Sequence, residues 1–234
     1  MELSAGRLVR SWAVLTVLGN RAMRLVCISD THSLHERIPP IPDGDVLIHA
    51  GDCTGSGALP QLDEFTRWFG ALPHKHKLLV AGNHDFCFER YRAWSQEMCL
   101  NQGITYLRGE SVILEGLNFY GFPWQPIFKH MAFNARDGEL KGRLKLVPEE
   151  TNVLISHGPA LHIFDYIPDQ GLHVGCYHLA KRIEQLPNLK AHICGHIHES
   201  YGFAVREIDG VKFANACSCD ARYRPVNPPI IIDI

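Results

Sequence analysis

The sequence of 234 residues has few of the features that mark a nucleic-acid-binding, membrane or zinc-finger protein. Its formal net charge is -2, so no excess of Lys and Arg provides a surface for nucleic acid or an anionic membrane. It has no paired C-x-x-C spacing of the kind that holds a structural zinc ion. It also has no repeat, no low-complexity tract and no interdomain linker. We therefore expect one globular domain with neither a nucleic-acid nor a membrane partner.

Long hydrophobic runs are also scarce. The first 22 residues contain one short run, Trp12 to Leu18, which follows Arg7 and Arg10 as in a signal peptide. The run is too short to span a bilayer, and residues 19–22 form a poor cleavage site. We expect residues 1–22 to be an extension outside the core and residues 23–234 to form the domain. A cleaved signal peptide is the alternative for this extension.

The eight cysteines do not suggest a disulfide framework. Cys27 and Cys194 lie within apolar strand-like runs, where a free thiol packs as a small hydrophobic group. Cys217 and Cys219 form the one close pair, which we interpret as structural rather than metal-binding or redox-active. Free buried thiols are typical of a reducing compartment, so we expect a cytoplasmic protein.

Histidine is abundant, with 14 residues in a chain that is 46% hydrophobic and 21% charged. Imidazole is the commonest side-chain ligand for transition metals. We expect eight of these histidines to be scattered over the surface: His35, His74, His76, His130, His162, His173, His178 and His192. The other six fit a surface location poorly, because they lie in or beside strand-like runs.

Strand-like and helical patterns alternate along the chain. Residues 24–29, 45–50 and 77–81 are apolar strand-like runs, and Leu59 to Phe69 has hydrophobic residues at helical spacing. Further strands are expected at 104–107, 111–114, 118–122, 152–156, 191–194 and 229–234, helices at 86–100, 138–146 and 177–186, and a hairpin at 203–214 around Asp209-Gly210. The alternation predicts parallel β-α-β units, whose ligands gather at the carboxyl ends of the strands.

Five short motifs follow the strand-like runs directly. They are Asp30-Thr31-His32, Gly51-Asp52, Gly82-Asn83-His84-Asp85, Ser156-His157-Gly158 and Gly195-His196-Ile197-His198. One such motif would mean little, because Asp and His are common at strand ends. Five of them in one chain must converge at one edge of the sheets, and this indicates a two-metal hydrolytic site.

The side chains in these motifs suit borderline cations. The candidate ligands are Asp30, His32, Asp52, Asn83, His157, His196 and His198. Asp30 and His32 are two residues apart in extended chain, so both can point to the same side. Carboxylate, amide and imidazole together suit Mn, Fe or Zn. A carboxylate such as Asp52 has two oxygens and can bridge two cations.

In this order the motifs resemble those of the calcineurin-like metallophosphoesterases, over residues 23–234. Further segments resemble the branch of metallophosphoesterase-domain-containing proteins in particular. These segments are 27–33, 80–84, Tyr120-Gly121-Phe122-Pro123-Trp124, 156–159, 196–199 and Asn227-Pro228-Pro229-Ile230-Ile231. The resemblance implies an α/β fold, a four-layer α/β/β/α sandwich of two mixed β-sheets.

The resemblance also implies two divalent metal ions as cofactors, with Mn favoured over Fe or Zn. It implies that Asp30, His32 and His198 bind the first ion, that Asn83, His157 and His196 bind the second, and that Asp52 bridges the two. A metal-bridging hydroxide would then be the nucleophile. His84 would lie at the leaving group, and Asp85 would orient the His84 ring.

Substrate contacts are expected from Asn83 and His84, which the resemblance places beside the phosphate. Trp124 is open to two interpretations. Residues 121–126 either form a turn that packs its aromatic rings in the core, or a loop that stacks a nucleobase on Trp124.

The function implied by the resemblance to the metallophosphoesterase-domain-containing branch is phosphodiester hydrolysis of small nucleotides, cyclic nucleotides among them. One alternative is a phosphomonoesterase or protein phosphatase, because no large cap domain restricts the cleft. Another is a nucleotide-binding scaffold with vestigial activity, although the retained His196 argues against it. The sequence does not determine the oligomeric state.

Overall fold

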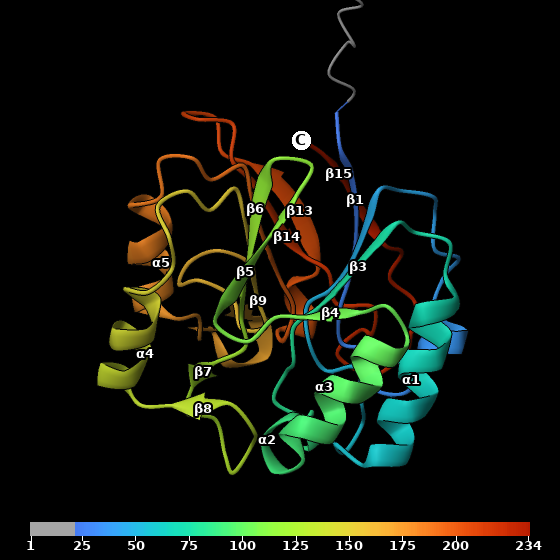
Figure 1. Ribbon diagram of the computed structural model, residues 1–234. Coiled ribbons are helices and arrows are strands. Elements are labelled where there is room, and N and C mark those ends of the chain that lie inside the picture. The colour runs from blue at the N-terminus through green and yellow to red at the C-terminus, as the bar shows by residue number, and fades with distance from the viewer. Residues whose placement is uncertain (1–21) are drawn as a thin grey trace, which may run out of the picture.

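The apolar runs of the sequence form two mixed β-sheets in the computed structural model, which describes residues 22–234 (Figure 1). The first sheet has the order β15(Ile230–Asp233), β1(Arg24–Ile28), β2(Val46–His49), β3(His76–Leu79) and β4(Thr105–Tyr106). Its strands β1 to β4 are parallel, and β15 is antiparallel to β1.

The second sheet has six strands. Their order is β13(Gly202–Val205), β14(Lys212–Asn215), β12(Ala191–Cys194), β9(Val153–Ser156), β6(Leu117–Phe122) and β5(Glu110–Leu114). The four central strands are parallel, whereas the outer strands β13 and β5 are antiparallel to their neighbours. The hairpin expected around Asp209-Gly210 is confirmed as β13 and β14, and Gly210 has a left-handed φ of 74° in their connection.

Helices cover the outer faces of both sheets (Figure 1). The first sheet carries α1(Leu59–Ala71), α2(Cys87–Arg90) and α3(Arg92–Asn101), and the second carries α4(Asp137–Leu144) and α5(Tyr177–Glu184). Short elements complete the chain: η1(His35–Arg37), β7(Gln125–Pro126), β8(Asn134–Ala135), β10(Tyr166–Ile167), η2(Pro168–Gln170), β11(Leu172–His173) and η3(His198–Ser200).

Three hydrophobic clusters hold these layers together. The central one lies between the sheets and joins residues such as Leu25 and Ile48 to Phe119 and Ile193. A second cluster packs the other face of the first sheet against α1, and a third packs the second sheet against α4 and α5. Successive strand residues point to opposite faces, so every central strand contributes to two clusters. The four-layer α/β/β/α sandwich is thereby confirmed.

Several local predictions were wrong. The helix expected at residues 86–100 is broken at Tyr91, whose φ of −129° and ψ of 45° separate α2 from α3. His35, His74 and His192 are buried rather than on the surface, and His192 Nε2 lies 2.9 Å from Ser156 Oγ. The two-residue strands β7, β8, β10 and β11 were not expected, because such short segments have no measurable periodicity.

All eight cysteines are free and buried, as the apolar setting of Cys27 and Cys194 indicated. Among the described helices, none combines the length and the apolar character needed to cross a lipid bilayer. The predictions for the N-terminal extension fall on residues 1–21, outside the described part of the chain.

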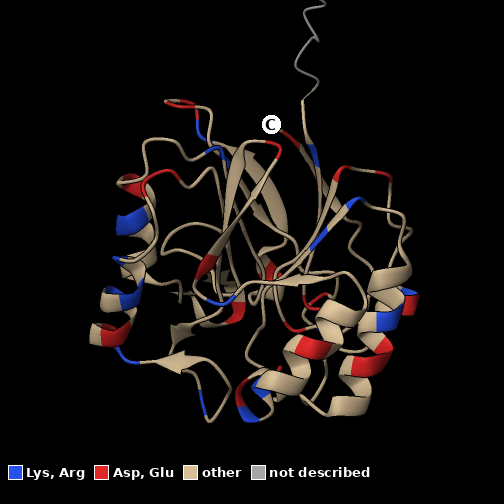
Figure 2. Cartoon of the chain, in the orientation of Figure 1, with Lys and Arg blue, Asp and Glu red and all other residues tan. Residues whose placement is uncertain are grey.

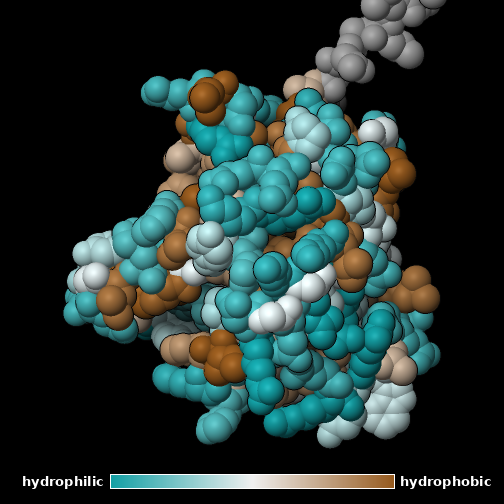
Figure 3. Space-filling view, turned by 90° about the vertical axis from the view of Figure 1, so that its left-hand side faces the viewer, coloured by the Kyte–Doolittle hydropathy of each residue, from teal (hydrophilic) through white to brown (hydrophobic). Residues whose placement is uncertain are grey.

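The surface carries charges of both signs. Figure 2 shows acidic and basic residues interspersed on the outer helices. Figure 3 shows the side of the molecule that carries α4 and α5, where hydrophobic residues form separate patches among hydrophilic ones. This distribution agrees with the nearly balanced charge of the sequence.

The carboxyl ends of the parallel strands of both sheets meet at one edge of the sandwich. An isolated parallel bridge between Ser29 and Cys217 joins the end of β1 to the segment that follows β14. The five motifs follow β1, β2, β3, β9 and β12 directly. The topology therefore brings all five to the place where the two sheets touch.

Candidate metal centre

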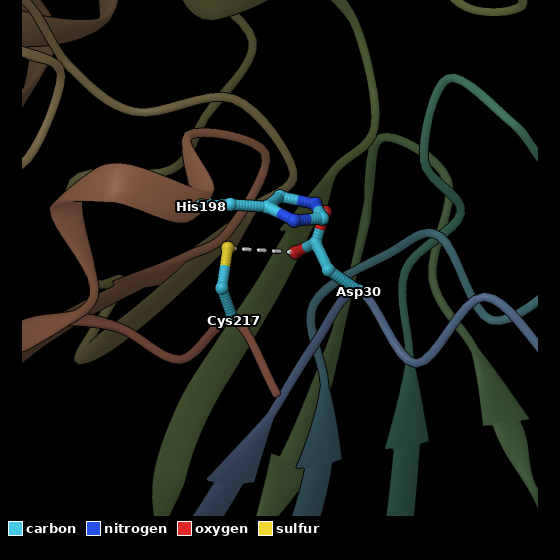
Figure 4. A group of neighbouring side chains, drawn as sticks. All are labelled: Asp30, His198 and Cys217. Carbon is cyan, nitrogen blue, oxygen red and sulfur yellow. Dashed lines mark hydrogen bonds and ion pairs between the residues drawn. The ribbon is translucent and has the colours of Figure 1, made fainter. Parts of the chain in front are cut away.

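A first group of candidate ligands comes from the segments after β1 and β12. The Nε2 atom of His198 lies 3.4 Å from Asp30 Oδ1 and 3.2 Å from His32 Nε2. Figure 4 shows His198 and Asp30 facing each other, with Cys217 beside the carboxylate. These three side chains come from opposite sheets, so only the sandwich brings them together.

A second group lies beside the first. The amide oxygen of Asn83 is 2.8 Å from His157 Nε2, and both side chains are buried. The ring of His196 lies 5.0 Å from that of His157, measured between centroids. Its partner in the motif, His198, belongs to the first group, so the alternating residues of Gly195-His196-Ile197-His198 serve both groups.

The Asp52 carboxylate lies between the two groups. Its Oδ2 atom is 3.9 Å from His32 Nε2 in the first group and 3.5 Å from His157 Nε2 in the second. Its Oδ1 atom accepts a hydrogen bond of 2.7 Å from the backbone amide of His84. One carboxylate can therefore contact cations in both groups.

The backbone at these residues is in an unusual conformation. Asp30, His32, Asp52 and His196 have φ values of 50°, 44°, 55° and 71°, in the left-handed region that residues other than glycine rarely adopt. Each such residue costs on the order of 1–3 kcal/mol unless its surroundings hold it, and such strain concentrates at functional sites. The turns reverse the chain at the strand ends and point the polar side chains inward.

Backbone carbonyls orient two of the imidazoles. His157 Nδ1 lies 3.0 Å from the oxygen of Ala50, and His198 Nδ1 lies 2.9 Å from that of Asp220. A carbonyl only accepts, so each Nδ1 carries a proton and donates it. The Nε2 atoms of both rings therefore face the cluster with the geometry of metal ligands.

The cluster fits divalent cations. Asp30 Oδ1 is buried without a hydrogen-bond partner, although a buried carboxylate oxygen needs one. Metal bonds of about 2.0–2.2 Å set neighbouring ligand atoms roughly 3–3.5 Å apart. His198 Nε2 lies within this range of both Asp30 Oδ1 and His32 Nε2, and the remaining distance, between Asp30 Oδ1 and His32 Nε2, is 3.9 Å. The mixture of imidazole nitrogen with carboxylate and amide oxygen suits Mn, Fe or Zn.

The electrostatics of the cluster call for positive charge. Burial opposes ionisation of Asp52, but the nearby His157 outweighs it and lowers the pKa of Asp52 to about 2. For His157 burial favours the neutral ring, yet the Asp52 carboxylate raises its pKa to about 9. Burial is likewise outweighed at His198, where Asp30 raises the pKa to about 9. Without cations, protons on these imidazoles supply the charge that the carboxylates require.

Glycines let the strand ends approach this closely. A Cβ atom at Gly82 would clash with the side chain and backbone of Asp52 and with the His157 ring. One at Gly195 would clash with the Asp30 carboxylate and with Ser29. Gly82 and Gly195, which open their motifs, are therefore needed for close packing against a ligand on a different strand.

We expect Gly82→Ala to weaken metal binding by roughly 10–100-fold, because the added methyl group pushes Asp52 away from His157. Isothermal titration with Mn²⁺ measures the effect. Gly142→Ala is the matched control, since a Cβ atom there meets nothing within 4 Å. Equal affinity in both variants would show that this close approach is unnecessary.

His84 lies next to the cluster. Its Nδ1 atom is 2.9 Å from the carbonyl oxygen of Gly55, and its Nε2 atom is 4.0 Å from Asp52 Oδ2. The ring packs edge-on against His32, with centroids 4.7 Å apart. Its side chain is 24% exposed, so Nε2 can meet a ligand in the cleft.

The prediction that Asp85 orients the His84 ring is wrong. The Asp85 carboxylate is buried and accepts hydrogen bonds from the amides of Gly82 and Thr54 and from the Thr54 hydroxyl. Within residues 22–234, the Asp85 carboxylate forms no hydrogen bond with the His84 ring, so it does not orient that ring directly. Asp85 acts one step away, because it fixes the loop whose Gly55 carbonyl holds the ring.

Trp124 does not line the cleft over the cluster. It packs against Phe122 with ring centroids 5.5 Å apart, and the guanidinium groups of Arg143 and Arg108 lie 4.1 and 5.6 Å from its ring. Of the two interpretations of residues 121–126, packing in the core is correct.

The cleft over the cluster has a volume of about 430 Å³. Two of its aromatic residues were missed by the sequence analysis. Phe128 lies edge-on to His196 at 5.9 Å, and the ring of Tyr223 lies 4.9 Å from His32 and 5.0 Å from His198. Both sit in loops without periodicity, so no sequence signal marked them.

The sequence pattern indicated a structural role for Cys217 and did not place it beside a candidate metal ligand. The Cys217 Sγ atom donates a hydrogen bond of 3.2 Å to Asp30 Oδ2 (Figure 4). The same oxygen accepts hydrogen bonds of 2.5 Å from the Ser29 hydroxyl and 3.0 Å from the His196 amide. The three donors hold Oδ2 and leave Oδ1 facing His198. The position of Cys217 just after a parallel strand was the available signal.

This chain is similar to known proteins over most of its length. A family model described as calcineurin-like phosphoesterase matches residues 23–200. Human metallophosphoesterase domain-containing protein 1 is 36% identical over 90% of this chain and 71% of its own. A UPF0046 protein of Caenorhabditis elegans is 36% identical over 94% of this chain and 83% of its own. A dimetal phosphatase from Danio rerio has a similar fold, with a TM-score of 0.52, 13% identity and coverage of 84% and 87%.

Proposed function

The chain belongs to the calcineurin-like phosphoesterase family, and we propose that it is a metal-dependent phosphodiesterase of small nucleotides, including cyclic nucleotides. Membership of this family implies hydrolysis of phosphoric esters with a pair of metal ions. The choice of diester and nucleotide is our proposal. It rests on the charge and shape of the cleft.

Seven side chains would hold the cations. Asp30, His32 and His198 would bind one, Asn83, His157 and His196 the other, and Asp52 would bridge them. When bound, two such cations would neutralise the phosphate charge and lower the pKa of a water molecule towards neutrality. Mn²⁺ is the favoured ion among those that the ligand types accept.

His84 would act at the leaving group. The Gly55 carbonyl accepts from Nδ1, so the opposite nitrogen, Nε2, faces the cleft. A protonated Nε2 can pass its proton to the departing ester oxygen, an effect worth roughly 10²–10⁴-fold in rate. The hydrogen bond from the His84 amide to Asp52 keeps the ring beside the cluster.

The charge of the cleft favours a diester over a monoester. Of the described residues that line it, none is Lys or Arg, and Glu199 adds a negative charge at the rim. A phosphate monoester carries a net charge of about −1.5 to −2 near neutral pH, whereas a phosphate diester carries only one negative charge. A diester therefore needs no cation beyond the metal centre. This observation carries the proposal.

The walls of the cleft suit the two substituents of a diester. Ile127 and Phe128 line the side next to His196, and Tyr223 lines the side next to His32 and His198. Both aromatic rings are about half exposed. A nucleobase can stack on such a face with a gain of roughly 1–3 kcal/mol.

With Mn²⁺, we expect kcat/KM for bis-p-nitrophenyl phosphate to exceed that for p-nitrophenyl phosphate by at least about tenfold. This corresponds to roughly 1.4 kcal/mol for the uncompensated second charge. Steady-state assays on the full chain measure the ratio. Preference for the monoester would favour the phosphatase alternative. Turnover of neither, despite bound metal, would favour a nucleotide-binding scaffold.

We expect Tyr223→Ala to raise KM for a cyclic nucleotide by roughly tenfold, with kcat little changed, because stacking contributes about 1–3 kcal/mol to binding. A panel of cyclic nucleotides, assayed with metal content measured in parallel, tests this. Tyr91→Ala is the control, since Tyr91 is similarly exposed but stacks on Trp94 in the helices. Unchanged KM in Tyr223→Ala would remove the support for a stacked base.

A further inference from the structure

A second group of potential metal ligands lies outside the catalytic cluster. His162 and Asp165 follow β9, and His173 lies in β11. One ligand atom from each of the three side chains lies within 4.8 Å of those of the other two. The rings of His162 and His173 meet edge to face, with centroids 4.6 Å apart. None of the three belongs to the motifs that form the metal centre.

The carboxylate of this group is fixed in place. Asp165 is 1% exposed, and its Oδ2 atom accepts hydrogen bonds from the amides of His162 at 2.9 Å and Gly175 at 3.0 Å. Its Oδ1 atom lies 2.6 Å from His173 Nδ1. Because Oδ2 is held by the backbone, Oδ1 stays directed at His173, whose ring meets that of His162.

The turn that presents His162 is strained. His162 and Phe164 have φ values of 66° and 52°, both in the left-handed region. Non-glycine residues persist there only where their surroundings hold them. The turn holds the ring of His162 against that of His173, even though the His162 side chain is exposed and could extend into solvent.

An ordinary hydrogen-bonded pair of histidine and carboxylate does not explain this arrangement. His178 and Asp137 form such a pair elsewhere, with His178 Nε2 2.8 Å from Asp137 Oδ1. The pair between His173 and Asp165 is similar, but a second imidazole joins it. Two imidazoles and one carboxylate make up a ligand set that proteins use for Zn²⁺ and related ions.

We propose that His162, Asp165 and His173 bind one Zn²⁺ ion, in a site separate from the two-metal centre. Zn²⁺ bonds of about 2.0–2.2 Å set neighbouring ligands roughly 3.4 Å apart in tetrahedral geometry. The exposed histidine rings can turn to reach this spacing around the fixed carboxylate. Water would complete the coordination, since both rings face solvent.

Zinc at this site would stabilise one wall of the cleft. Ile167 and Gln170, which line the cleft, lie in the segment between the ligands. The Ser200 hydroxyl donates a hydrogen bond of 2.8 Å to the carbonyl oxygen of Tyr166. This bond connects the segment to η3, which begins at His198. A metal that joins His162 to His173 would link the two ends of residues 162–173. It would therefore limit movement of this segment away from the cleft.

Zinc binding to the full chain tests the proposal. We expect the wild type to bind one Zn²⁺ more than His162→Ala or His173→Ala, in competition with a chromophoric chelator. His178→Ala is the matched control, because its pair with Asp137 lacks a third ligand, and it should bind as many ions as the wild type. Equal stoichiometry in the wild type and both ligand variants would overturn the proposal.

Protection from diethylpyrocarbonate gives a second readout that does not depend on counting ions. With Zn²⁺ added, His162 and His173 should become resistant to modification in the wild type, whereas His130, which is exposed and lies elsewhere, should stay reactive. Reactivity of His162 and His173 that is unchanged by Zn²⁺ would also overturn the proposal. Neither measurement depends on turnover, so the phosphodiesterase proposal is tested separately.

Discussion

Asp52→Asn is expected to weaken both metal positions and to lower kcat by roughly 10³-fold or more. The Asp52 carboxylate lies 3.9 Å from His32 and 3.5 Å from His157, and these residues belong to different ligand groups. An amide of the same shape keeps the hydrogen bond from the His84 backbone but removes the negative charge shared by the two positions. Loss of one preorganised electrostatic contact alone costs about 10²–10³-fold.

Metal analysis of the purified variant, together with Mn²⁺ titration, measures the first effect, and steady-state assays measure the second. Asp63→Asn is a suitable control, because Asp63 forms an exposed ion pair with Arg67 on α1. That variant should keep its metals and its activity. Two metals bound to Asp52→Asn with unchanged affinity would show that Asp52 is not the bridging ligand.

His84→Ala is expected to keep both metals while kcat falls by roughly 10²–10⁴-fold, the range for loss of a general acid. Its Nε2 atom faces the cleft and lies 4.0 Å from Asp52 Oδ2, whereas Nδ1 is already bonded to the Gly55 carbonyl. The ring therefore has one nitrogen available to the substrate. Loss of metal from this variant would show that His84 is a ligand instead.

The leaving group distinguishes proton donation from simple phosphate binding. An ester with a p-nitrophenolate leaving group needs little protonation, so His84→Ala should affect it least. A methyl or nucleoside ester should lose much more, because an alkoxide departs poorly without a proton. His76→Ala is the control, since His76 begins β3 at the opposite end of the strand from the cluster. An equal loss for all leaving groups would exclude the general-acid role.

The order of the motifs predicted which side chains lie together. Asp30 and His32 follow the end of strand β1, and His196 and His198 follow the end of strand β12. Parallel strands end at the same edge of a sheet, so local pattern was enough to predict this convergence. The left-handed turns at these strand ends could not be predicted. They are occupied by four residues other than glycine, and such residues rarely adopt a positive φ.

Contacts between separate loops were predicted poorly. Asp85 follows His84 in sequence, yet its carboxylate turns to Thr54, and the distant Gly55 carbonyl holds the His84 ring. Trp124 was equally compatible with a buried and an open position, and Arg143 and Phe122 cover it. Adjacent positions in a turn can point in different directions, so sequence distance does not determine these partners.

The sequence alone determined the strands of the two main sheets, most of the helices that cover them and the seven side chains at the strand ends, because each depends on periodicity or on position relative to one strand. The tertiary structure alone decided that Phe128 and Tyr223 form the walls of the cleft and that His162 and His173 meet at Asp165. Apart from His173 in the two-residue strand β11, these residues lie in loops, whose paths are set by packing against segments far away in the chain. Long-range packing leaves no periodic signal in the sequence, so only the folded chain reveals it.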